Sequence, residues 1–410
     1  MQRLFDLIPA GVTRIDLLAP PFSGHLHPVL ALGRALSAHY QVRIITTRGA
    51  AAAVAAAGLS GLTLPGDYDT PLLAVVNPQY AVGSHPLRLY RQFRNVVGLL
   101  KNFADELEAL WRREDVPDLS IADFTLPIVG EVCRRLHVPW WSSLPSPCVL
   151  ETADGVPAYC GGLMPAENRY QRIMHAVHRK KVRLFKQAVF WLFRDVIRQT
   201  GIMRLYRQDG SESAYSPQRI LALSEETFEF PRSWPAAVRF IGPALYTPPL
   251  QGAAPPFEEG KRHVLVTLGT HLDWHKDAVV KAVIALAATL PDWVFHFTDG
   301  HPIAAGQQQQ GNFYRVPWVN YDSWLTQYDA VIHHGGAGIM WHCLEKRIPA
   351  LVYPVDYDQF DHAARLVWSG KGAWIKGGLK GLERAGPLLL GVVNVKAVSY
   401  THLTLPTTPY

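Results

Sequence analysis

Apolar and polar residues follow two different rhythms along this chain, and the two rhythms alternate. Short apolar runs bounded by turn residues, such as RIDLLAPPF at 14–22, predict a buried strand that runs into a loop. Stretches with apolar residues three and four positions apart, such as 27–40, predict helices. The alternation continues through strands at 41–47, 118–124 and 139–147 and a helix at 127–138. Strands that alternate with helices are typical of parallel sheets in an α/β fold.

One stretch interrupts this alternation and divides the chain. Residues 241–262 are rich in Pro and Gly and have no periodicity, which is typical of a linker. We therefore predict an N-terminal domain at 1–240 and a C-terminal domain at 263–396, each Rossmann-like and doubly wound. Strands are predicted again at 263–270, 293–300, 330–336 and 349–355, with a helix at 276–290.

The last residues, 397–410, break the preceding pattern. The sequence AVSYTHLTLPTTPY resembles the in-frame translation of a transposon-end sequencing adapter. We expect this tail to be non-native and to contribute no functional residue, which would leave the C-terminal domain truncated.

Composition supports a globular protein with two cores. The chain has 410 residues, of which 48% are hydrophobic and 18% charged, and a single core rarely grows beyond roughly 250–300 residues. The four cysteines form no C-x-x-C pair, which argues against a zinc ribbon. Asp6, Arg14 and Asp16 interrupt the apolar residues near the start, so we expect no signal peptide and a cytoplasmic protein.

The net charge of +6 is concentrated in residues 168–208, where Asp195 is the only acid among eleven Lys and Arg residues. A solvated helix face is one interpretation. Apolar residues between the charges favour a second one, an amphipathic surface that contacts anionic lipid at the inner face of the membrane. No nucleic-acid-binding motif accompanies the segment, so we expect no nucleic acid partner.

The stretch DAVIHHGGAGIMWHCLEKRIP at 329–349 carries the strongest local signal. It reads as a short buried strand, a glycine turn and the start of a helix. The N-terminus of a helix binds phosphate well, and glycines let an anion approach the backbone. A plain strand–helix turn is the alternative. Metal binding is disfavoured, because adjacent histidines at a strand end point in opposite directions.

Three stretches in order resemble the sugar-nucleotide box of family 1 glycosyltransferases: WVNY (318–321), HGGAGI (334–339) and PALVYPVDYDQFDHA (349–363). Four further features occur in the order found in that family, and together the resemblance covers residues 12–378. They are GHLHP (24–28), IAD (121–123), VRFIGP (238–243) and VTLGT (266–270). The resemblance, which is nearest to the bacterial macrolide glycosyltransferases, implies the GT-B fold, in which two Rossmann-like domains face each other across a cleft.

The resemblance also implies the roles of residues at the donor site. Trp318 is expected to stack on the nucleobase, with the backbone near Val319 on its edge, and Asp358 and Gln359 to bind hydroxyls of the donor sugar. The positions implied for the diphosphate are Thr270, His334, Gly335, Gly336, Ala337, Gly338 and Ile339. Gly24, in the GHLHP stretch of the N-terminal domain, is also implied to bind the nucleotide-sugar. Such donors stabilise the leaving group's charge without a metal ion. A UDP- or TDP-sugar is therefore expected as substrate, with no cofactor.

The same resemblance implies a catalytic pair in the N-terminal domain. His25, on the first turn after a strand, is expected to remove a proton from an acceptor hydroxyl, and Asp123 to hold the imidazole's other nitrogen. An unperturbed imidazole titrates near pH ~6.5, so it is a competent base at neutral pH. The implied reaction inverts the configuration of the sugar. The alternative for His25 is a helix-capping residue.

Four positions depart from the family pattern. A Pro-Gln pair is usual where this chain has Asn320-Tyr321, and a ribose-binding Glu where it has His342. Ile339 replaces a Ser or Thr, and His362 replaces an asparagine. These departures leave open the preference for base, ribose and sugar.

The leading hypothesis is the transfer of a hexose from a UDP- or TDP-sugar to a hydroxyl of a hydrophobic small molecule or lipid. A nucleotide-sugar epimerase or hydrolase on the same fold is an alternative. A non-catalytic nucleotide-sugar or lipid-binding protein is another, because His342 stands where a carboxylate is usual.

Overall fold

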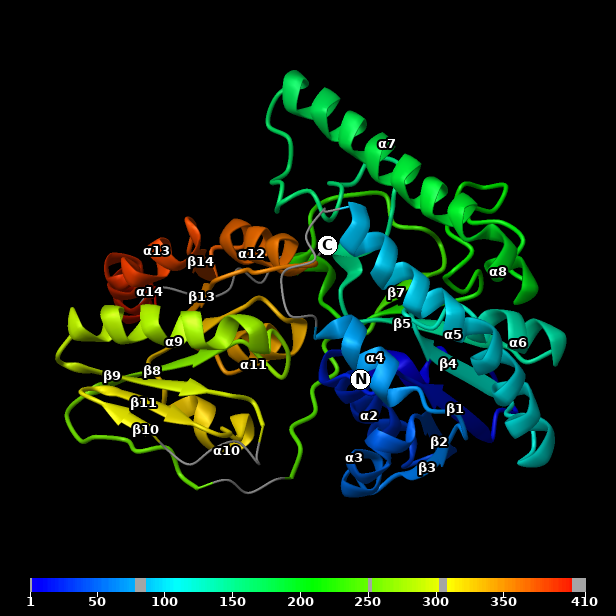
Figure 1. Cartoon of the computed structure of the whole chain (residues 1–410), viewed down its shortest axis with the longest axis horizontal. Coiled ribbons are helices and arrows are strands. Elements are labelled where there is room, and N and C mark those ends of the chain that lie inside the picture. Colours follow the sequence, from blue (N-terminus) through cyan, green and yellow to red (C-terminus); the bar gives the residue numbers. More distant parts are fainter. Residues whose placement is uncertain (1, 78–85, 250–252, 302–307, 400–410) are drawn as a thin grey trace. The chain divides into compact units, whose positions relative to one another are not determined.

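The computed structural model describes residues 2–77, 86–249, 253–301 and 308–399 (Figure 1). The chain divides into two compact units. The first comprises Met1–Pro249 with Asp356–Asp361, and the second comprises Leu250–Val355 with His362–Tyr410. Residues 400–410 of the predicted tail lie outside the described part of the chain.

The first unit contains a seven-stranded sheet in the order β3-β2-β1-β4-β5-β6-β7, and all its strand pairs are parallel. Its strands are β1 (Arg14–Leu18), β2 (Gln41–Thr46), β3 (Ser60–Thr63), β4 (Leu119–Asp123), β5 (Trp140–Leu144), β6 (Ile220–Ala222) and β7 (Val238–Phe240). The central strand β1 pairs with β2 on one side and β4 on the other, although β4 begins about a hundred residues later. The carboxyl ends of β1 and β4 are therefore neighbours.

Helices cover both faces of this sheet (Figure 1). Ile15 and Leu17 of β1 pack in one apolar cluster with residues of α2, such as Leu30. The next residue, Leu18, packs in another cluster with Trp111 of α5. Side chains of β1 thus pack into apolar clusters on both faces of the sheet, as expected where helices cover both faces. The helices are α1 (Gln2–Phe5), α2 (Ser23–Leu36), α3 (Ala51–Ala56), α4 (Asp69–Val76), α5 (Pro86–Arg113), α6 (Val129–Arg135), α7 (Arg169–Leu192) and α8 (Arg194–Gln199).

Helix α2 begins four residues earlier than the sequence pattern predicts, at Ser23 instead of residue 27. Phe22 is extended, and its carbonyl accepts the N–H groups of His25 and Leu26. Pro28 lies inside this helix, where it lacks the N–H that would donate to the carbonyl of Gly24 and its ring crowds that carbonyl. His25 therefore lies in the first turn of a helix, not on the preceding loop.

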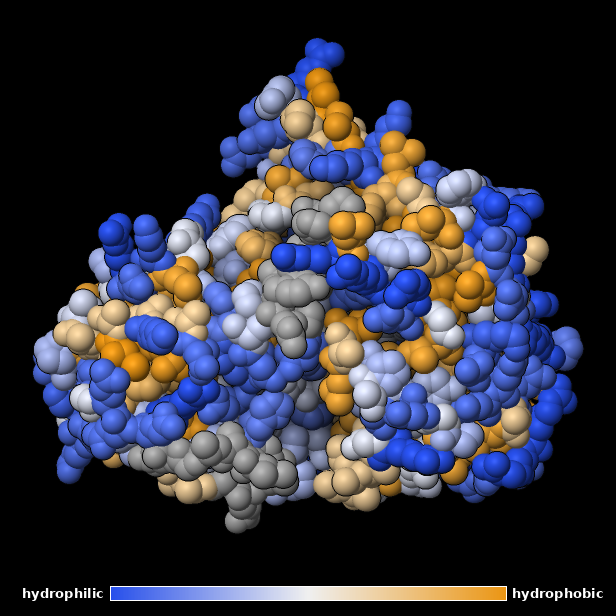
Figure 2. Space-filling view, viewed as in Figure 1, coloured by the Kyte–Doolittle hydropathy of each residue, from blue (hydrophilic) through white to orange (hydrophobic). Residues whose placement is uncertain are grey.

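Helix α7 has an unusual distribution of side chains. Tyr170, Ile173, Val177, Leu184 and Trp191 recur at helical spacing and are between 53% and 71% exposed. Val189 and Phe190 on the other side pack with Phe193 against Val97. The region around α7 at the top of Figure 2 shows hydrophobic residues at the surface among hydrophilic ones. The outward face of α7 is thus apolar and is flanked by basic residues. No helix in the described part of the chain is long and apolar enough to span a membrane.

The second unit contains a seven-stranded sheet in the order β10-β11-β9-β8-β12-β13-β14. Only β10, at one edge, is antiparallel to its neighbour. The strands are β8 (Arg262–Thr267), β9 (Trp293–Thr298), β10 (Gln308–Gln310), β11 (Phe313–Val316), β12 (Ala330–His333), β13 (Ala350–Val352) and β14 (Gly372–Trp374). The helices are α9 (Asp273–Ala288), α10 (Tyr321–Trp324), α11 (Ala337–Glu345), α12 (Gln359–Trp368), α13 (Gly378–Glu383) and α14 (Gly386–Ser399).

The central strands of this second sheet are β8 and β12, and both are buried over nearly their whole length. Val264 and Val266 of β8 pack with Val279 and Val283 of α9 in the largest apolar cluster of the unit. Each such side chain contributes about 1.5–3 kcal/mol by leaving water. The loops after β8 and β12 are consequently held side by side at the carboxyl end of the sheet.

Candidate functional site

His25 and Asp123 meet at the carboxyl ends of the neighbouring strands β1 and β4. The Nδ1 atom of His25 lies 3.1 and 3.2 Å from the two carboxylate oxygens of Asp123. Asp123 also accepts hydrogen bonds from the N–H and hydroxyl of Thr125. With Nδ1–H donated to Asp123, the Nε2 atom of His25 carries the lone pair and is the nitrogen able to accept a proton.

The surroundings of His25 raise the pKa of its imidazole. Burial alone would lower the pKa, but the negative charge of Asp123 and its hydrogen bond outweigh that effect. The Asp123 side chain is fully buried, whereas the His25 side chain is 28% exposed. The rings of Phe22 and Phe124 lie 6.3 and 5.6 Å from the imidazole. The arrangement gives one reachable proton acceptor beside apolar walls.

His334 follows β12 and lies between two glycines of the second unit. A Cβ atom on Gly336 would lie 2.5 Å from its Nε2, and a Cβ on Gly269 would lie 2.9 Å from its Cε1. Gly269 also has a φ of +72°, which disfavours any other residue. These glycines therefore make room for the imidazole itself, in addition to any ligand. Thr270 comes directly after Gly269 in the chain, and its hydroxyl lies 3.2 Å from Nδ1 of His271.

Two buried histidines hold the peptide groups of Gly335, which has a φ of +98°. The N–H of Gly335 donates to Nδ1 of His333 at 3.0 Å, and its carbonyl accepts from Nδ1–H of His362 at 2.6 Å. Burial lowers the pKa of His333 to about 3, so its ring stays neutral and can accept this bond. Sequence reasoning missed this function of His362, for which the only signal was a histidine in place of the usual asparagine.

The N-terminus of α11 comes directly after this turn. Gly336 precedes the helix in an extended conformation, and no side chain caps the helix. The first N–H groups of a helix have no partner within it, so those of Ala337, Gly338 and Ile339 are available for an anion. A strand end, a fixed glycine turn and an uncapped helix thus place the residues predicted for the diphosphate in one short segment.

The residues predicted for the nucleobase lie after β11. Trp318 is half-buried, and its buried Nε1–H has no acceptor among the described residues, whereas Val319 is 2% exposed. The side chain of Asn320 accepts the N–H of Ser323 and caps α10. Two of the positions that depart from the family pattern contact each other, because the rings of Tyr321 and His342 lie 5.5 Å apart edge to face. Burial lowers the pKa of His342 to about 4, so this pair is neutral.

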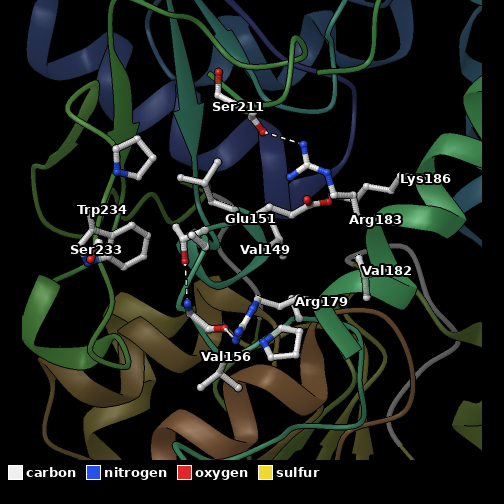
Figure 3. A pocket seen from close by; sticks show the side chains of 18 of the residues that line it. Val149, Glu151, Val156, Arg179, Val182, Arg183, Lys186, Ser211, Ser233 and Trp234 are labelled. Atoms are coloured by element: carbon white, nitrogen blue, oxygen red, sulfur yellow. Dashed lines mark hydrogen bonds and ion pairs between the residues drawn. The ribbon is translucent and has the colours of Figure 1, made fainter. Parts of the chain in front are cut away.

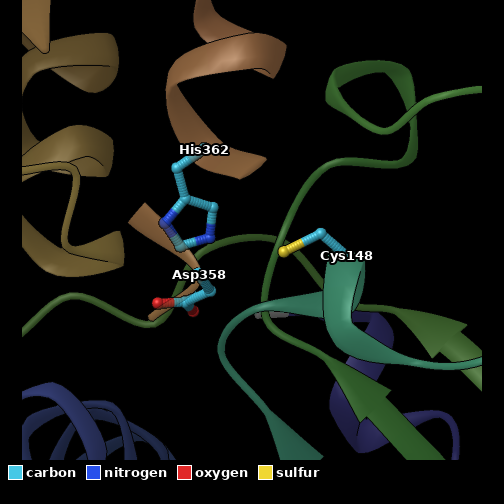
Figure 4. Close-up of side chains that lie close together, drawn as sticks. All are labelled: Cys148, Asp358 and His362. Atoms are coloured by element: carbon cyan, nitrogen blue, oxygen red, sulfur yellow. The ribbon is translucent and has the colours of Figure 1, made fainter. Parts of the chain in front are cut away.

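Asp358 and Gln359 stand at the start of α12. Figure 4 draws Asp358, His362 and Cys148; Asp358 and Cys148 belong to the first unit, and His362, in the first turn of α12, belongs to the second. The carbonyl oxygen of the Gln359 side chain accepts the N–H of Asp356 at 3.0 Å. Gln359 is 6% exposed. Its carbonyl therefore orders the segment before the helix, and only its amide nitrogen can donate a bond to a sugar.

Comparisons with known proteins agree with this fold. No family model matches the chain. The chain is 25% identical over 374 residues to 4'-demethylrebeccamycin synthase of Lentzea aerocolonigenes, a match that spans 88% of this chain and 87% of the relative. The crystal structure of the glycosyltransferase of kitacinnamycin superposes with a TM-score of 0.70 at 21% identity, covering 95% of this chain and 92% of that one. Spinosyn rhamnosyltransferase in complex with thymidine diphosphate superposes with a TM-score of 0.60 at 18% identity, covering 95% of each chain.

Two α/β units, each built on a largely parallel sheet, are the architecture that the sequence predicts, and the solved structures share the fold. The predictions of an α/β GT-B fold and of a glycosyltransferase are confirmed. The chain is a glycosyltransferase of the GT-B fold, similar in sequence to 4'-demethylrebeccamycin synthase and to O-mycaminosyltylonolide 6-deoxyallosyltransferase of Streptomyces fradiae.

Proposed function

We propose that the protein transfers a hexose from a UDP- or TDP-sugar to a hydroxyl of a hydrophobic small molecule or lipid, with inversion and without a metal ion. The hydrogen bond between His25 and Asp123 is the observation that carries this proposal. It supports the proposal because the imidazole has a raised pKa and one nitrogen able to accept a proton, and because an aromatic side chain suited to an apolar acceptor lies beside it.

The chemistry then follows a simple displacement. The acceptor hydroxyl gives its proton to Nε2 of His25 as its oxygen forms a bond to the anomeric carbon. The bond between that carbon and the diphosphate breaks, and the nucleoside diphosphate leaves with the electron pair. Asp123 stabilises the imidazolium that forms, as the carboxylate does in a catalytic triad.

The leaving diphosphate is proposed to bind at the start of α11. His334 and the N–H groups of Ala337, Gly338 and Ile339 supply hydrogen bonds and the positive end of the helix dipole. Such donors are worth most where charge develops in the transition state. The turn that presents them is fixed by His333 and His362, so little reorganisation is needed when the bond breaks.

For the donor we propose that thymidine diphosphate binds at least as well as uridine diphosphate. A carboxylate at position 342 could accept hydrogen bonds from two ribose hydroxyls, as the family resemblance implies. The neutral, buried His342 cannot do so, and a deoxyribose has no 2'-hydroxyl that needs this contact. One solved structure of the same fold holds thymidine diphosphate.

The experiment that tests the proposed transfer is mass spectrometry of products after incubation with UDP- and TDP-sugars and a panel of hydroxylated apolar acceptors. We expect the mass of one hexose to be added to an acceptor, and His25→Ala to lose this activity while calorimetry shows unchanged binding of thymidine diphosphate. An isomerised or hydrolysed sugar without acceptor product would refute transfer. Unchanged turnover in the variant would refute the role of His25.

A further inference from the structure

A cavity of about 590 Å³ lies in the first unit, outside the residues that the proposed reaction uses (Figure 3). Its lining comes from the segment after β5, one side of α7, the loop at 209–211 and the residues 233–236. Small-molecule sites typically have volumes of ~300–1,000 Å³. The cavity is therefore large enough for a natural product or a lipid-sized molecule.

The lining of the cavity is apolar on one part and cationic on another. Val149, Val156 and Trp234 contribute apolar surface, and α7 contributes Arg179 and Arg183. Figure 3 shows the residues of α7 on one side of the cavity and Ser233 and Trp234 on the opposite side. A ligand that fits this division has an apolar body and a polar group at one end.

The charges of the lining do not cancel. Lys186 forms ion pairs with Glu151 and Glu212, both at 2.7 Å, so one ammonium group faces two carboxylates, and Asp209 adds a further carboxylate to the lining. Among the described residues, neither Arg179 nor Arg183 has a carboxylate partner. Arg179 donates to the carbonyl of Gly155 at 2.9 Å, and Arg183 donates to the carbonyl of Gly210 and stacks 3.9 Å above the ring of Tyr206. The four cations of the lining, Arg179, Lys180, Arg183 and Lys186, thus outnumber the carboxylates of Glu151, Asp209 and Glu212 by one, and neither guanidinium is held in an ion pair.

Apolar side chains connect the cavity to His25. Val149 and Trp234 of the lining pack in the same cluster as Tyr215 and Phe124. The ring of Phe124 lies 6.4 Å from that of Tyr215 and 5.6 Å from the imidazole of His25. A chain of packed side chains thus links the lining of the cavity to the proposed base.

We infer, on the basis of the glycosyl transfer proposed above, that the acceptor is an apolar molecule carrying an anionic group, and that this cavity binds its anionic end through Arg179 and Arg183. A guanidinium presents several donors in a plane and matches the geometry of a carboxylate, and a charge-assisted hydrogen bond is stronger than a neutral one. The arginines would discriminate between an acid and its neutral ester, while the apolar wall would not.

The inference is tested with two probes that have the same ring system and differ by one charged group. 8-Anilinonaphthalene-1-sulfonate carries a sulfonate, and N-phenyl-1-naphthylamine lacks it. We expect the intact protein to bind the sulfonate at least about tenfold more tightly, and Arg179→Met to remove most of this difference without weakening the neutral probe. Arg172→Met, on the same helix but outside the cavity lining, is the matched control and should keep the difference.

Lys180→Met provides a second variant, because Lys180 lines the cavity and is exposed, so its loss should not affect folding. It should reduce the preference for the sulfonate in part. Equal affinities for the two probes in the intact protein, or a preference that survives both Arg179→Met and Lys180→Met, would overturn the inference. These binding measurements need no turnover, so they can fail while sugar transfer is observed, and can succeed while it is not.

A second pair of compounds tests the same charge selectivity on a larger apolar frame. Deoxycholate and its methyl ester share two hydroxyls and a rigid apolar frame, and differ in one negative charge. We expect deoxycholate, but not the ester, to displace the sulfonate probe from the intact protein, and to do so about tenfold less well from Arg179→Met. Displacement by both compounds alike would show that the cavity does not select an anion.

Discussion

At the scale of single residues, the pair of His25 and Asp123 leads to a prediction about pH. The base must be neutral to accept a proton, and its pKa is raised above the ordinary value of 6.5. The value of kcat/KM should therefore fall as the pH drops through a value above 6.5. In Asp123→Asn the raising charge is lost, so the acid limb should move to lower pH while the maximal rate drops. A pH–rate profile checks this, and an acid limb that does not move would contradict the role of Asp123.

The glycines around His334 give a second prediction at this scale. In Gly336→Ala the new Cβ would lie 2.5 Å from Nε2 of His334, so the imidazole must move. We expect calorimetry to show thymidine diphosphate binding at least about tenfold more weakly, a cost of about 1.4 kcal/mol. Gly391→Ala, in α14, is the matched control, since a Cβ there meets nothing within 4 Å and alanine favours a helix. If both variants bind equally well, His334 does not contact the donor.

The hydrogen bond between His362 and the carbonyl of Gly335 gives a third prediction at this scale. Removing His362 in His362→Leu leaves the buried carbonyl of Gly335 without its donor. We expect a loss of about 1–3 kcal/mol in the free energy of unfolding, together with weaker binding of thymidine diphosphate. His362→Asn can restore the hydrogen bond and should recover much of both. Denaturant unfolding and calorimetry of the two variants separate a positioning role from a purely structural one, which would leave the nucleotide affinity of folded His362→Leu unchanged.

At the scale of secondary-structure elements, α11 contains a titrating group that makes the second unit sensitive to acid. His342 has a pKa of about 4 in the folded protein, against 6.5 for an ordinary imidazole. Below pH 6.5 the unfolded chain binds a proton that the folded chain does not, so stability falls with pH until about pH 4. His342→Gln should reduce this loss by up to about 3 kcal/mol. Unfolding curves at several pH values measure the loss of stability in the unmodified protein and in His342→Gln. The same pH dependence in the two proteins would contradict the prediction.

The elements themselves were predictable to different degrees. The alternation of apolar runs predicts the strands at 41–47, 118–124 and 293–300, because buried parallel strands leave a strong local signature. The start of α2 was predicted four residues late, because the extended conformation of Phe22, which sets it, has no local signature. The sequence does not predict the hydrogen bond from His362 to the carbonyl of Gly335, because these residues are 27 positions apart in sequence. The pairing of His25 with Asp123 could be predicted only through the family resemblance, since 98 positions separate them.

At the scale of the whole molecule, the exposed apolar face of α7 predicts binding to membranes. Helix α7 contains no acidic residue, and Lys180 and Lys181 stand beside its apolar face. We expect the protein to sediment with vesicles of phosphatidylcholine and phosphatidylglycerol, less at high salt, since each basic residue near an anionic surface contributes about 1 kcal/mol.

Substitution on this face provides the test of that prediction. Leu184→Glu should weaken vesicle binding strongly, because it places a negative charge among the exposed apolar residues of α7. Leu388→Glu, at an exposed leucine of the second unit, is the matched control and should have no effect. Equal sedimentation of both variants with the vesicles would show that α7 is not the contact surface.

The strand order of the first unit has a consequence for engineering. Because β1 and β4 are neighbours in the sheet, the geometry of His25 and Asp123 does not depend on the length of the chain between β3 and β4. That stretch contains α4 and α5; among its described residues, Leu107 and Trp111 pack on the sheet, and Val97 packs with Phe193. Its remaining surface can therefore be exchanged with that of related enzymes to recruit new acceptors, while the groups that handle the proton remain in place.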